Sequence, residues 1–501
     1  MNPPLAAPAR GSFAQRCGVH DLARQQACDE ALSRIRDRGL GFVRIGWCDV
    51  HGLMRSKTLT PLAAARALTQ GIGLVSTLLL KDSSDRTAYP VFAPGGTAAL
   101  PGIGQANNLV GLPDPHSLVD LPWVERTGWM RADLWHADAQ PVAIDPRRVL
   151  ERSLERLQHA GYGLRCGLEL EFHIYRITDT TAQLDPAQAA WPGEPPAVQM
   201  IHPGYSLLNE AWADMAEPAL RIVHGVAQGL GLPLLSLEAE MGPSQVEAVF
   251  DVSDALTAAD QLALFRNAVR QALRRAGYHA SFMCRPPFAN VMSSGWHLHQ
   301  SWVDRHTGRN VFGREQPAAG ATLQDAGWSL SDLGEHVLAG LLWHAPGCTL
   351  LCTPTANGYA RFRPQALAPQ AVLWGRDNRG AMLRVIGEPG DESTHLENRL
   401  GEAAANPYLY LASQVEAGLD GLCRQLRAPP ATDDPYGAPA AALPRSLDEA
   451  IAAFLADEVM VQGISESFAR HLVRLKRAEA QRFEQAQDKD EFQRREYFGR
   501  L

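Results

Sequence analysis

Two acidic residues interrupt an apolar segment, and this feature constrains the fold more than any other in the chain. Residues 167–172 read GLELEF, with carboxylates at Glu169 and Glu171. Because side chains alternate along a strand, both carboxylates lie on one face of it. Burial of an unpaired carboxylate costs free energy and neighbouring carboxylates repel each other, so the segment indicates a bound cation. For this segment taken alone, an exposed strand edge is the alternative.

Three further clusters of polar residues lie between apolar positions. Residues 237–247 mix acids with an apolar strand that a Gly-Pro pair interrupts. Residues 294–301 read SGWHLHQS and place two histidines on one strand face, although such a pair alone is more often structural. Beyond residue 357, arginines are interleaved with apolar residues, which suits recognition of phosphate and carboxylate oxygens, although each alone could form a surface ion pair.

The pattern of apolar residues predicts both helices and strands. Residues 1 to about 20 are expected to be disordered, and a β-hairpin is expected over residues 42–59. After residue 146, helices and strands alternate, and the last eighty residues are mostly helical. The expected helices lie at about 19–38, 255–275 and 330–345, and the expected strands at about 168–175, 234–250, 279–284, 296–303 and 380–387.

Composition excludes several classes of function. A chain of 501 residues with 46% hydrophobic and 20% charged residues is typical of a globular protein with two or three domains. The formal net charge of -8 and the lack of a long basic run argue against nucleic acid as a partner. The first twenty residues contain no apolar block of seven or more, and no stretch has the length of a membrane helix, so we expect a cytoplasmic protein without a membrane partner.

Taken in order, the motifs resemble those of the glutamine synthetase family over residues 41 to 409. They are G-x-E-x-E, E-x-G-P-x-Q-x-E, S-G-W-H-x-H-x-S, N-x-Y-x-R, D-N-R-x-x-x-x-R, E-x-R and A-N-P-Y-L. The resemblance implies an α+β fold, in which a small N-terminal β-grasp-like domain precedes a large catalytic domain with a curved antiparallel sheet flanked by helices. The implied divisions are an extension with the first helix (1–38), the β-grasp-like domain (39–140) and the catalytic domain (141–501).

The resemblance also implies which residues bind metal. One metal site of the family matches Glu171, Glu240 and Glu247. A second site matches Glu169, His297 and Glu397. Oxygen ligands with one imidazole suit Mg²⁺ or Mn²⁺, and two or three ions are expected.

The same resemblance implies an ATP site and an acyl-substrate site. Arg361 and Arg399 match the arginines that hold the carboxylate substrate, and Arg379 and Arg384 match those that clamp the ATP phosphates. His299 and Ser301 match nucleotide contacts. Because no G-x-x-x-x-G-K-[ST] loop is present, metals and arginines are expected to hold the phosphates.

The amine site departs from the family pattern. In ammonia-using members, a glutamate that binds ammonium stands two residues before the proline of a flap segment, where this chain has Leu367. Asp49 matches the aspartate that a neighbouring subunit contributes to the ammonium site, and Tyr205 matches a tyrosine of that site. Leucine weakens a site for a small cation and favours an amine that carries carbon. A second departure is Met292-Ser293, where the family has a glutamate-binding Asn-Gly pair.

These motifs predict an ATP-dependent carbon-nitrogen ligase that joins the γ-carboxylate of glutamate to an amine through a γ-glutamyl phosphate. The departures resemble the γ-glutamyl-polyamine and γ-glutamyl-anilide ligase branches, with a slight preference for an aromatic amine. Glutamine synthetase proper and a catalytically inactive relative are the alternatives, and a metal-dependent hydrolase is disfavoured because no motif for its base or nucleophile is present. The resemblance further implies homo-oligomers of stacked rings, with active sites at subunit boundaries.

Overall fold

The computed structural model describes residues 11–178, 189–363 and 367–501, which form two compact units. The smaller unit comprises the described residues up to 49, together with 54–79 and 89–145. The larger unit comprises residues 50–53 and 80–88, together with the described residues from 146 to 501. The sequence pattern does not reveal that two short N-terminal segments belong to the larger unit.

The smaller unit is built on a sheet in the order β2-β1-β6-β4-β3, with β5 paired to β6. Its strands are β1 (Phe42–Cys48), β2 (Met54–Leu59), β3 (Ile72–Val75), β4 (Asn108–Pro113), β5 (Val119–Asp120) and β6 (Thr127–Trp135). Its helices are α1 (Phe13–Arg16), α2 (Leu22–Asp37) and α3 (Pro61–Gln70). The expected hairpin is the antiparallel pair of β1 and β2, and β1 also pairs in parallel with β6.

The expectation of disorder up to about residue 20 is wrong for the described part of that segment. Ser12 caps α1 through a reciprocal hydrogen-bonded pair with Gln15, which satisfies backbone N–H groups at the helix start. Phe13 is buried and packs in a cluster with Leu112 and Trp135. One aromatic side chain in a stretch of small residues was too weak a pattern to predict this short helix.

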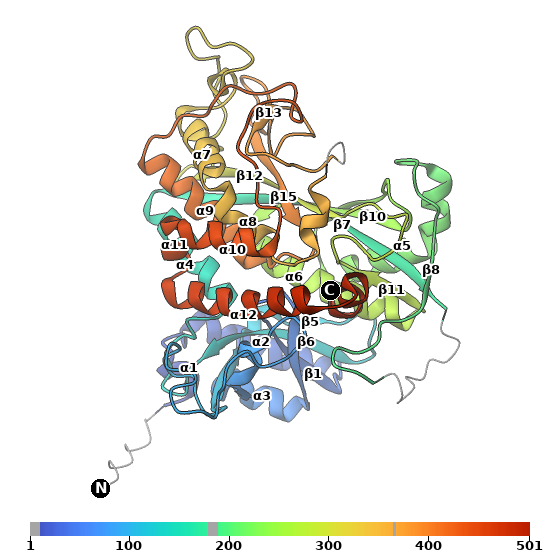
Figure 1. Cartoon of the computed structure of the whole chain (residues 1–501). Coiled ribbons are helices and arrows are strands. Elements are labelled where there is room, and N and C mark those ends of the chain that lie inside the picture. Colours follow the sequence, from blue (N-terminus) through green and yellow to red (C-terminus); the bar gives the residue numbers. More distant parts are fainter. Residues whose placement is uncertain (1–10, 179–188, 364–366) are drawn as a thin grey trace. The chain divides into compact units, whose positions relative to one another are not determined.

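The larger unit contains a nine-stranded sheet in the order β13-β14-β15-β12-β7-β10-β9, with β8 and β11 paired to β7 (Figure 1). Its strands are β7 (Tyr162–Ile177), β8 (Val198–Met200), β9 (Leu234–Ala239), β10 (Gln245–Asp254), β11 (Tyr278–Ser281), β12 (Gly295–Asp304), β13 (Trp374–Arg376), β14 (Leu383–Ile386) and β15 (His395–Glu402). Apart from the parallel pair β13 and β14, these pairings are antiparallel. The predicted α+β class with a large antiparallel sheet is confirmed.

The helices of this unit pack against the sheet or against one another. They include α4 (Pro146–His159), α5 (Glu210–Leu230), α6 (Ala255–Arg275), α7 (Asp332–Trp343), α8 (Ala345–Cys352) and α9 (Pro407–Cys423). The C-terminal region contains α10 (Leu447–Ala456), α11 (Glu458–Gly463), α12 (Glu466–Gln485), α13 (Lys489–Gln493) and a π-helical turn at Arg494–Phe498. α6 contacts β7, β10 and β11, and α9 contacts α4, α6, α7 and α8.

The two faces of β7 differ as the period of two predicts. Leu168, Leu170 and Phe172 are buried on the helical side, where Phe172 meets Phe265 of α6 edge-on. The residues between them, Glu169 and Glu171, therefore lie on the opposite face. The apolar face anchors the strand, which leaves the acidic face to form a site.

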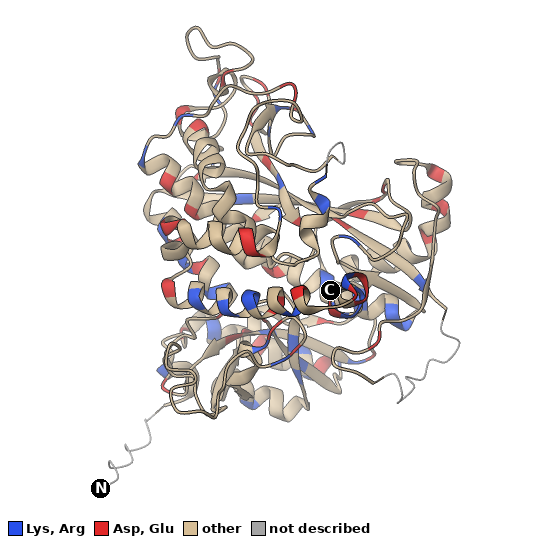
Figure 2. Cartoon of the chain, viewed as in Figure 1, with Lys and Arg blue, Asp and Glu red and all other residues tan. Residues whose placement is uncertain are grey.

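Surface charge is mixed rather than segregated. Figure 2 shows acidic and basic residues interspersed along helices of the larger unit, including α12. Among the described helices, none is both long and apolar enough to cross a membrane.

A buried histidine joins three helical elements of the larger unit. His344 lies between α7 and α8, with Nδ1 2.8 Å from Asp457 Oδ2 and Nε2 2.8 Å from Asp420 Oδ2. Both ring nitrogens donate only when the imidazole is protonated. Burial acts to lower the pKa of His344, but the hydrogen bonds with the two aspartates outweigh it and raise the pKa above its usual value.

The protonated form of His344 should therefore stabilise the folded chain. We expect His344→Gln to lower the unfolding free energy by about 3 kcal/mol at mildly acidic pH, because Asp457 loses the protonated imidazole and Asp420 keeps only Arg424 as a charged partner. Since the folded pKa is raised, this contribution is complete below the unfolded pKa of about 6.5 and disappears as the pH rises through the folded value. Denaturant unfolding at several pH values, with the exposed His224→Gln as control, measures the difference. If the difference in unfolding free energy between the wild type and His344→Gln stayed constant or increased with pH, the protonated His344 would not be the stabilising form.

Candidate active site

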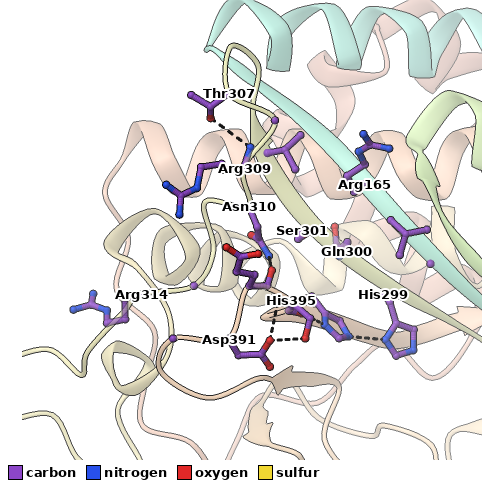
Figure 3. Close-up of a pocket in the computed structure, with 18 of the residues that line it drawn as sticks. Arg165, His299, Gln300, Ser301, Thr307, Arg309, Asn310, Arg314, Asp391 and His395 are labelled. Atoms are coloured by element: carbon purple, nitrogen blue, oxygen red, sulfur yellow. Dashed lines mark hydrogen bonds between the residues drawn. The ribbon is translucent and has the colours of Figure 1, made fainter.

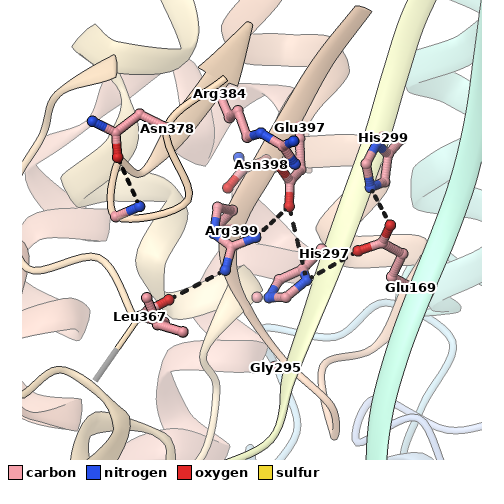
Figure 4. A network of polar contacts seen from close by, with 12 residues as sticks. Glu169, Gly295, His297, His299, Leu367, Asn378, Arg384, Glu397, Asn398 and Arg399 are labelled. Atoms are coloured by element: carbon pink, nitrogen blue, oxygen red, sulfur yellow. Dashed lines mark hydrogen bonds and ion pairs between the residues drawn. The ribbon is translucent and has the colours of Figure 1, made fainter. Parts of the chain in front are cut away.

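The register of four adjacent strands brings the acidic and imidazole residues together. Figure 4 shows four of them, Glu169, His297, His299 and Glu397. In the antiparallel pairs, His299 of β12 lies opposite Glu397 of β15, and His297 of β12 lies opposite Glu169 of β7. Glu171 of β7 lies opposite Glu247 of β10. Side chains of directly opposed residues have Cβ atoms about 5 Å apart, so the pairings form a continuous row across the sheet.

Glu171, Glu240 and Glu247 form the first acidic cluster. One carboxylate oxygen from each lies within 4.8 Å of the others. Glu240 follows directly after β9, and its backbone N–H is bonded to the carbonyl of Gln245 at 3.0 Å. Gln245 Nε2 donates to Glu171 Oε2 at 3.1 Å, and the N–H of Gly295 donates to the same oxygen at 2.7 Å. These donors orient Glu171 without neutralising the cluster.

Electrostatics leave this cluster short of positive charge. Burial raises the pKa of Glu247, and the nearby carboxylates of Glu171 and Glu169 raise it further. Burial and then Glu240 raise the pKa of Glu171, against the opposing effect of Arg361. A cation among these oxygens would relieve both desolvation and repulsion. Three carboxylates with hard oxygen donors fit Mg²⁺ or Mn²⁺.

Glu169, His297 and Glu397 form the second cluster. His297 Nδ1 is 3.3 Å from Glu169 Oε2 and 3.8 Å from Glu397 Oε1. Burial, aided by Arg399, lowers the pKa of His297 to about 4, so the ring is neutral at physiological pH and keeps a lone pair for a cation. The contact of His297 Nδ1 with Glu169 Oε2 at 3.3 Å is at most one long hydrogen bond. A cation could therefore take the place of this hydrogen bond and bind both residues.

His299 also belongs to the second cluster. Its Nε2 is 3.1 Å from Glu169 Oε1, and suitable atoms of Glu169, His299 and Glu397 lie within 4.8 Å of one another. A further group with the same spacing combines Glu169, Glu247 and His297. The two clusters are therefore adjacent. Either His297 or His299 could bind the same ion as Glu169.

Glu397 differs from the other acids because arginines already neutralise it. Arg384 Nη1 donates to its Oε2 at 2.9 Å, and Arg399 Nη1 donates to its Oε1 at 2.5 Å. Burial would raise its pKa, but His297, Arg399 and Arg384 together hold the pKa at about 2. Arg384 Nε also donates to Asp377 at 2.9 Å, a partner with no role assigned by the sequence motifs.

Arg361 is buried beside the strand that carries both histidines. Its Nη1 donates to the carbonyls of Arg399 and Gly401 at 2.8 and 3.1 Å. A Cβ at Gly295 would come within 2.6 Å of Arg361 Nη2, so glycine is required for this close approach. Two backbone carbonyls of β15 thus hold the guanidinium, whose positive charge lowers the pKa of Glu171.

A cavity of about 660 Å³ opens beside the acidic clusters (Figure 3). His299 and Ser301 line it, which brings together the two residues that were predicted to contact the nucleotide. Its size lies within the range of small-molecule sites. His395, which the motifs did not single out, also lines the cavity, and its Nε2 lies 2.9 Å from His299 Nδ1.

Some predicted residues lie apart from the clusters. Arg379 is exposed, and no hydrogen bond or ion pair joins it to the acids among the described residues. Asp49 is buried at the end of β1, where its Oδ2 accepts from Arg55 Nε at 2.8 Å. Tyr205 is exposed and has a left-handed backbone conformation, with φ of 57°.

Leu367 lies at the edge of the site. It is 57% exposed, and its carbonyl accepts from Arg399 Nη2 at 3.2 Å. Of the aromatic residues near the motifs, Trp296 is fully buried against Tyr410, with ring centroids 4.7 Å apart. Trp296 is therefore core, whereas the Leu367 side chain is accessible.

Comparisons with known proteins agree with this geometry. The family model of the glutamine synthetase catalytic domain matches residues 143–495. A γ-glutamylanilide synthase of Acinetobacter sp. is 34% identical over 495 residues, covering 95% of this chain and 97% of that protein. A γ-glutamylethanolamide synthetase of Streptomyces coelicolor is 34% identical over 374 residues, covering 74% of this chain and 76% of that protein. The solved structure of GmaS without ligand superposes with a TM-score of 0.74 at 28% identity, covering 92% and 98% of the two chains.

The family match extends over most of the chain, and its span contains both acidic clusters, their arginines and the cavity. The chain therefore belongs to the glutamine synthetase family and is a ligase.

Proposed function

We propose that the chain joins the γ-carboxylate of glutamate to a carbon-bearing amine and converts ATP to ADP and phosphate. The row of carboxylates and imidazoles beside a cavity of nucleotide size is the observation that carries this proposal. The similar proteins support the amine, because their names refer to an anilide and an ethanolamide. Glutamine synthetase proper, with ammonia as acceptor, is the second candidate, since relatives with that name are also similar.

The proposed reaction has two steps. An oxygen of the substrate γ-carboxylate attacks the γ-phosphorus of ATP, the bond to the β-phosphate oxygen breaks, and ADP leaves. The amine nitrogen then attacks the acyl carbon, phosphate leaves with the C–O bond electrons, and the nitrogen loses a proton. Divalent cations, when bound, supply positive charge that offsets the charge of the phosphate oxygens.

Residues of the chain would hold the reactants in place. Glu171, Glu240 and Glu247 would seat one cation, and Glu169, His297 and Glu397 a second. Arg361 and Arg399 would orient the acyl substrate, while Arg384 would offset phosphate charge. Arg379 would need to approach from its exposed position to do the same. His299 and Ser301 would contact the nucleotide from the wall of the cavity.

The position of Leu367 supports a carbon-bearing amine as the acceptor. The guanidinium of Arg399 donates both to the backbone carbonyl of Leu367 and to the carboxylate of Glu397. Leu367 therefore lies next to the second cluster. An exposed aliphatic side chain cannot bind or deprotonate ammonium, but it packs well against carbon. An aniline arrives uncharged and gains from such a contact, whereas a polyamine arrives as a cation and requires carboxylates. We therefore favour an aromatic amine, and an alkyl amine or polyamine, which is protonated at neutral pH, is the alternative acceptor.

We also propose a homo-oligomer of stacked rings, in which Asp49 and Tyr205 help to form the amine site at a subunit boundary. Asp49 would act while paired with Arg55 or after that ion pair opens. A cytoplasmic location is part of the same proposal.

The chain should require both glutamate and a carbon-bearing amine for ADP release. With ATP and Mg²⁺, we expect an aromatic or alkyl amine to give turnover at least tenfold above equal ammonium, which corresponds to about 1.4 kcal/mol. A coupled ADP assay over a panel of amines, with the product mass from the same mixtures, measures this preference. Equal turnover with ammonium alone would assign the chain to glutamine synthetase proper, and no turnover with any amine would indicate an inactive relative.

Substitution of Leu367 tests the acceptor more directly. Leu367→Glu should raise KM for the preferred amine about tenfold, since the carboxylate replaces an apolar contact, and should increase the use of ammonium. The matched control is Leu455→Glu on α10, where the leucine is also exposed. Unchanged KM values for the amine and for ammonium in Leu367→Glu would show that Leu367 does not contact the amine.

The metal site predicts a change in thermal stability. Excess Mn²⁺ at about 100 times its Kd should stabilise the wild-type chain by about 2.7 kcal/mol. Glu247→Gln should raise the melting temperature of the metal-free chain, because it removes a repelling carboxylate, and should abolish most of the rise with Mn²⁺. The control is Glu402→Gln, which changes a fully buried carboxylate outside both clusters. The same Mn²⁺-dependent rise in Glu247→Gln and wild type would contradict the site.

A further inference from the structure

Two imidazoles in contact connect the acidic row with the cavity. His395 is the first residue of β15, and its Nε2 lies 2.9 Å from Nδ1 of His299 on β12. The two rings are tilted by 49°, and their centroids are 5.1 Å apart. Both side chains line the cavity, where Figure 3 shows them facing each other. His299 therefore contacts His395 through one ring nitrogen and lies beside Glu169 with the other.

The hydrogen bonds of these two rings run in one direction. His395 Nδ1 lies 2.6 Å from the backbone carbonyl of Ser393. A carbonyl oxygen can only accept, so Nδ1 of His395 carries a proton. At pH 7.5, about one unit above the usual pKa of histidine, a neutral imidazole has no second proton. Nε2 of His395 is then an acceptor, and Nδ1 of His299 donates to it.

This direction leaves a lone pair on Nε2 of His299. A neutral ring that donates through Nδ1 has no proton on Nε2. The Nε2 atom is buried and forms no hydrogen bond with any residue that the structure describes, although Glu169 Oε1 lies 3.1 Å away. Two buried acceptors that face each other without a proton are unfavourable, and a cation between them would stabilise both. Glu397 offers a third ligand atom within 4.8 Å of these two.

His297 differs from His299 because no fixed acceptor orients its ring. Its Nδ1 is 3.3 Å from Glu169 Oε2, and its Nε2 is 3.7 Å from Glu171 Oε1. Within the described part of the chain, both nitrogens thus face carboxylates of the two clusters. Histidines that bind metals almost always donate their other ring N–H to a carbonyl, a carboxylate or water outside the site, which fixes the tautomer. His395 offers His299 an equivalent acceptor.

We propose that His299 is a ligand of the second cation through Nε2, and that His395 is the positioning residue that holds His299 in the required tautomer. His299 thereby joins Glu169 and Glu397 at the ion, in addition to the nucleotide contact proposed above. His395 does not touch the ion, because its own Nε2 is occupied by the N–H of His299. This inference rests on the proposed function, since it takes the second cluster as a cation site.

The strength of Mn²⁺ binding tests the role of His395. Mn²⁺ is titrated into the full chain at pH 7.5 without nucleotide, and free Mn²⁺ is measured by electron paramagnetic resonance. His395→Leu removes the acceptor and should weaken one Mn²⁺ site about 10-fold or more, leaving the other unchanged. His395→Gln keeps an acceptor oxygen and should stay within about threefold of the wild type. The matched control is His224→Leu at an exposed position of α5, which should bind like the wild type.

A double-mutant cycle separates positioning from a general structural effect. His299→Leu removes the ligand itself, so it should weaken the same Mn²⁺ site at least as much as His395→Leu does. If His395 acts through His299, His395→Leu should cause no further loss in the His299→Leu chain. Losses that multiply in the double variant would overturn the assignment, as would equal losses in His395→Leu and His395→Gln.

The titration contains no substrate, so its result does not depend on ligase activity. Two Mn²⁺ sites in the wild type, with the coupled losses described above, would support the inference whether or not an amine is joined to glutamate. Two Mn²⁺ sites with unchanged binding in His395→Leu would overturn the role of His395 alone. A wild-type chain that binds no Mn²⁺ at the second cluster would overturn both this inference and the proposed cation site.

Discussion

The register of the antiparallel strands β15, β12, β7 and β10 is the constraint on which the site depends. It opposes Glu397 to His299, Glu169 to His297 and Glu171 to Glu247. A shift of one residue in any pairing would turn one side-chain row to the opposite face, where the helices pack. The apolar residues that alternate with the acids, such as Leu170 and Phe172, hold the register because they are buried under α6. One face of these strands thus packs in the core, and the opposite face carries the residues of the site.

Charge is distributed unequally along the row. Glu397 receives two arginines and has a depressed pKa, whereas burial and neighbouring acids raise the pKa of Glu171 and of Glu247. The fold therefore keeps one end of the row neutralised by its own side chains and leaves the other end in need of external cations. This imbalance costs stability in the free chain and gives a divalent cation a reason to bind there.

Much of this site could be predicted from the sequence because strand periodicity is local. The alternation in residues 167–172 and 294–301 correctly placed the acids and the histidines on single faces. Local patterns do not report which strands pair or in what register, so the contact of His299 with Glu169 and the bridge from Gln245 to Glu171 could not be foreseen.

We propose that the row of carboxylates seats divalent cations beside the cavity that would take the nucleotide. Anomalous scattering from crystals grown with Mn²⁺ and ADP tests this most directly. We expect one Mn²⁺ peak bounded by Glu171, Glu240 and Glu247, and another bounded by Glu169, Glu397 and a histidine. Well-ordered crystals with ADP in the cavity but no Mn²⁺ peak at either cluster would contradict it.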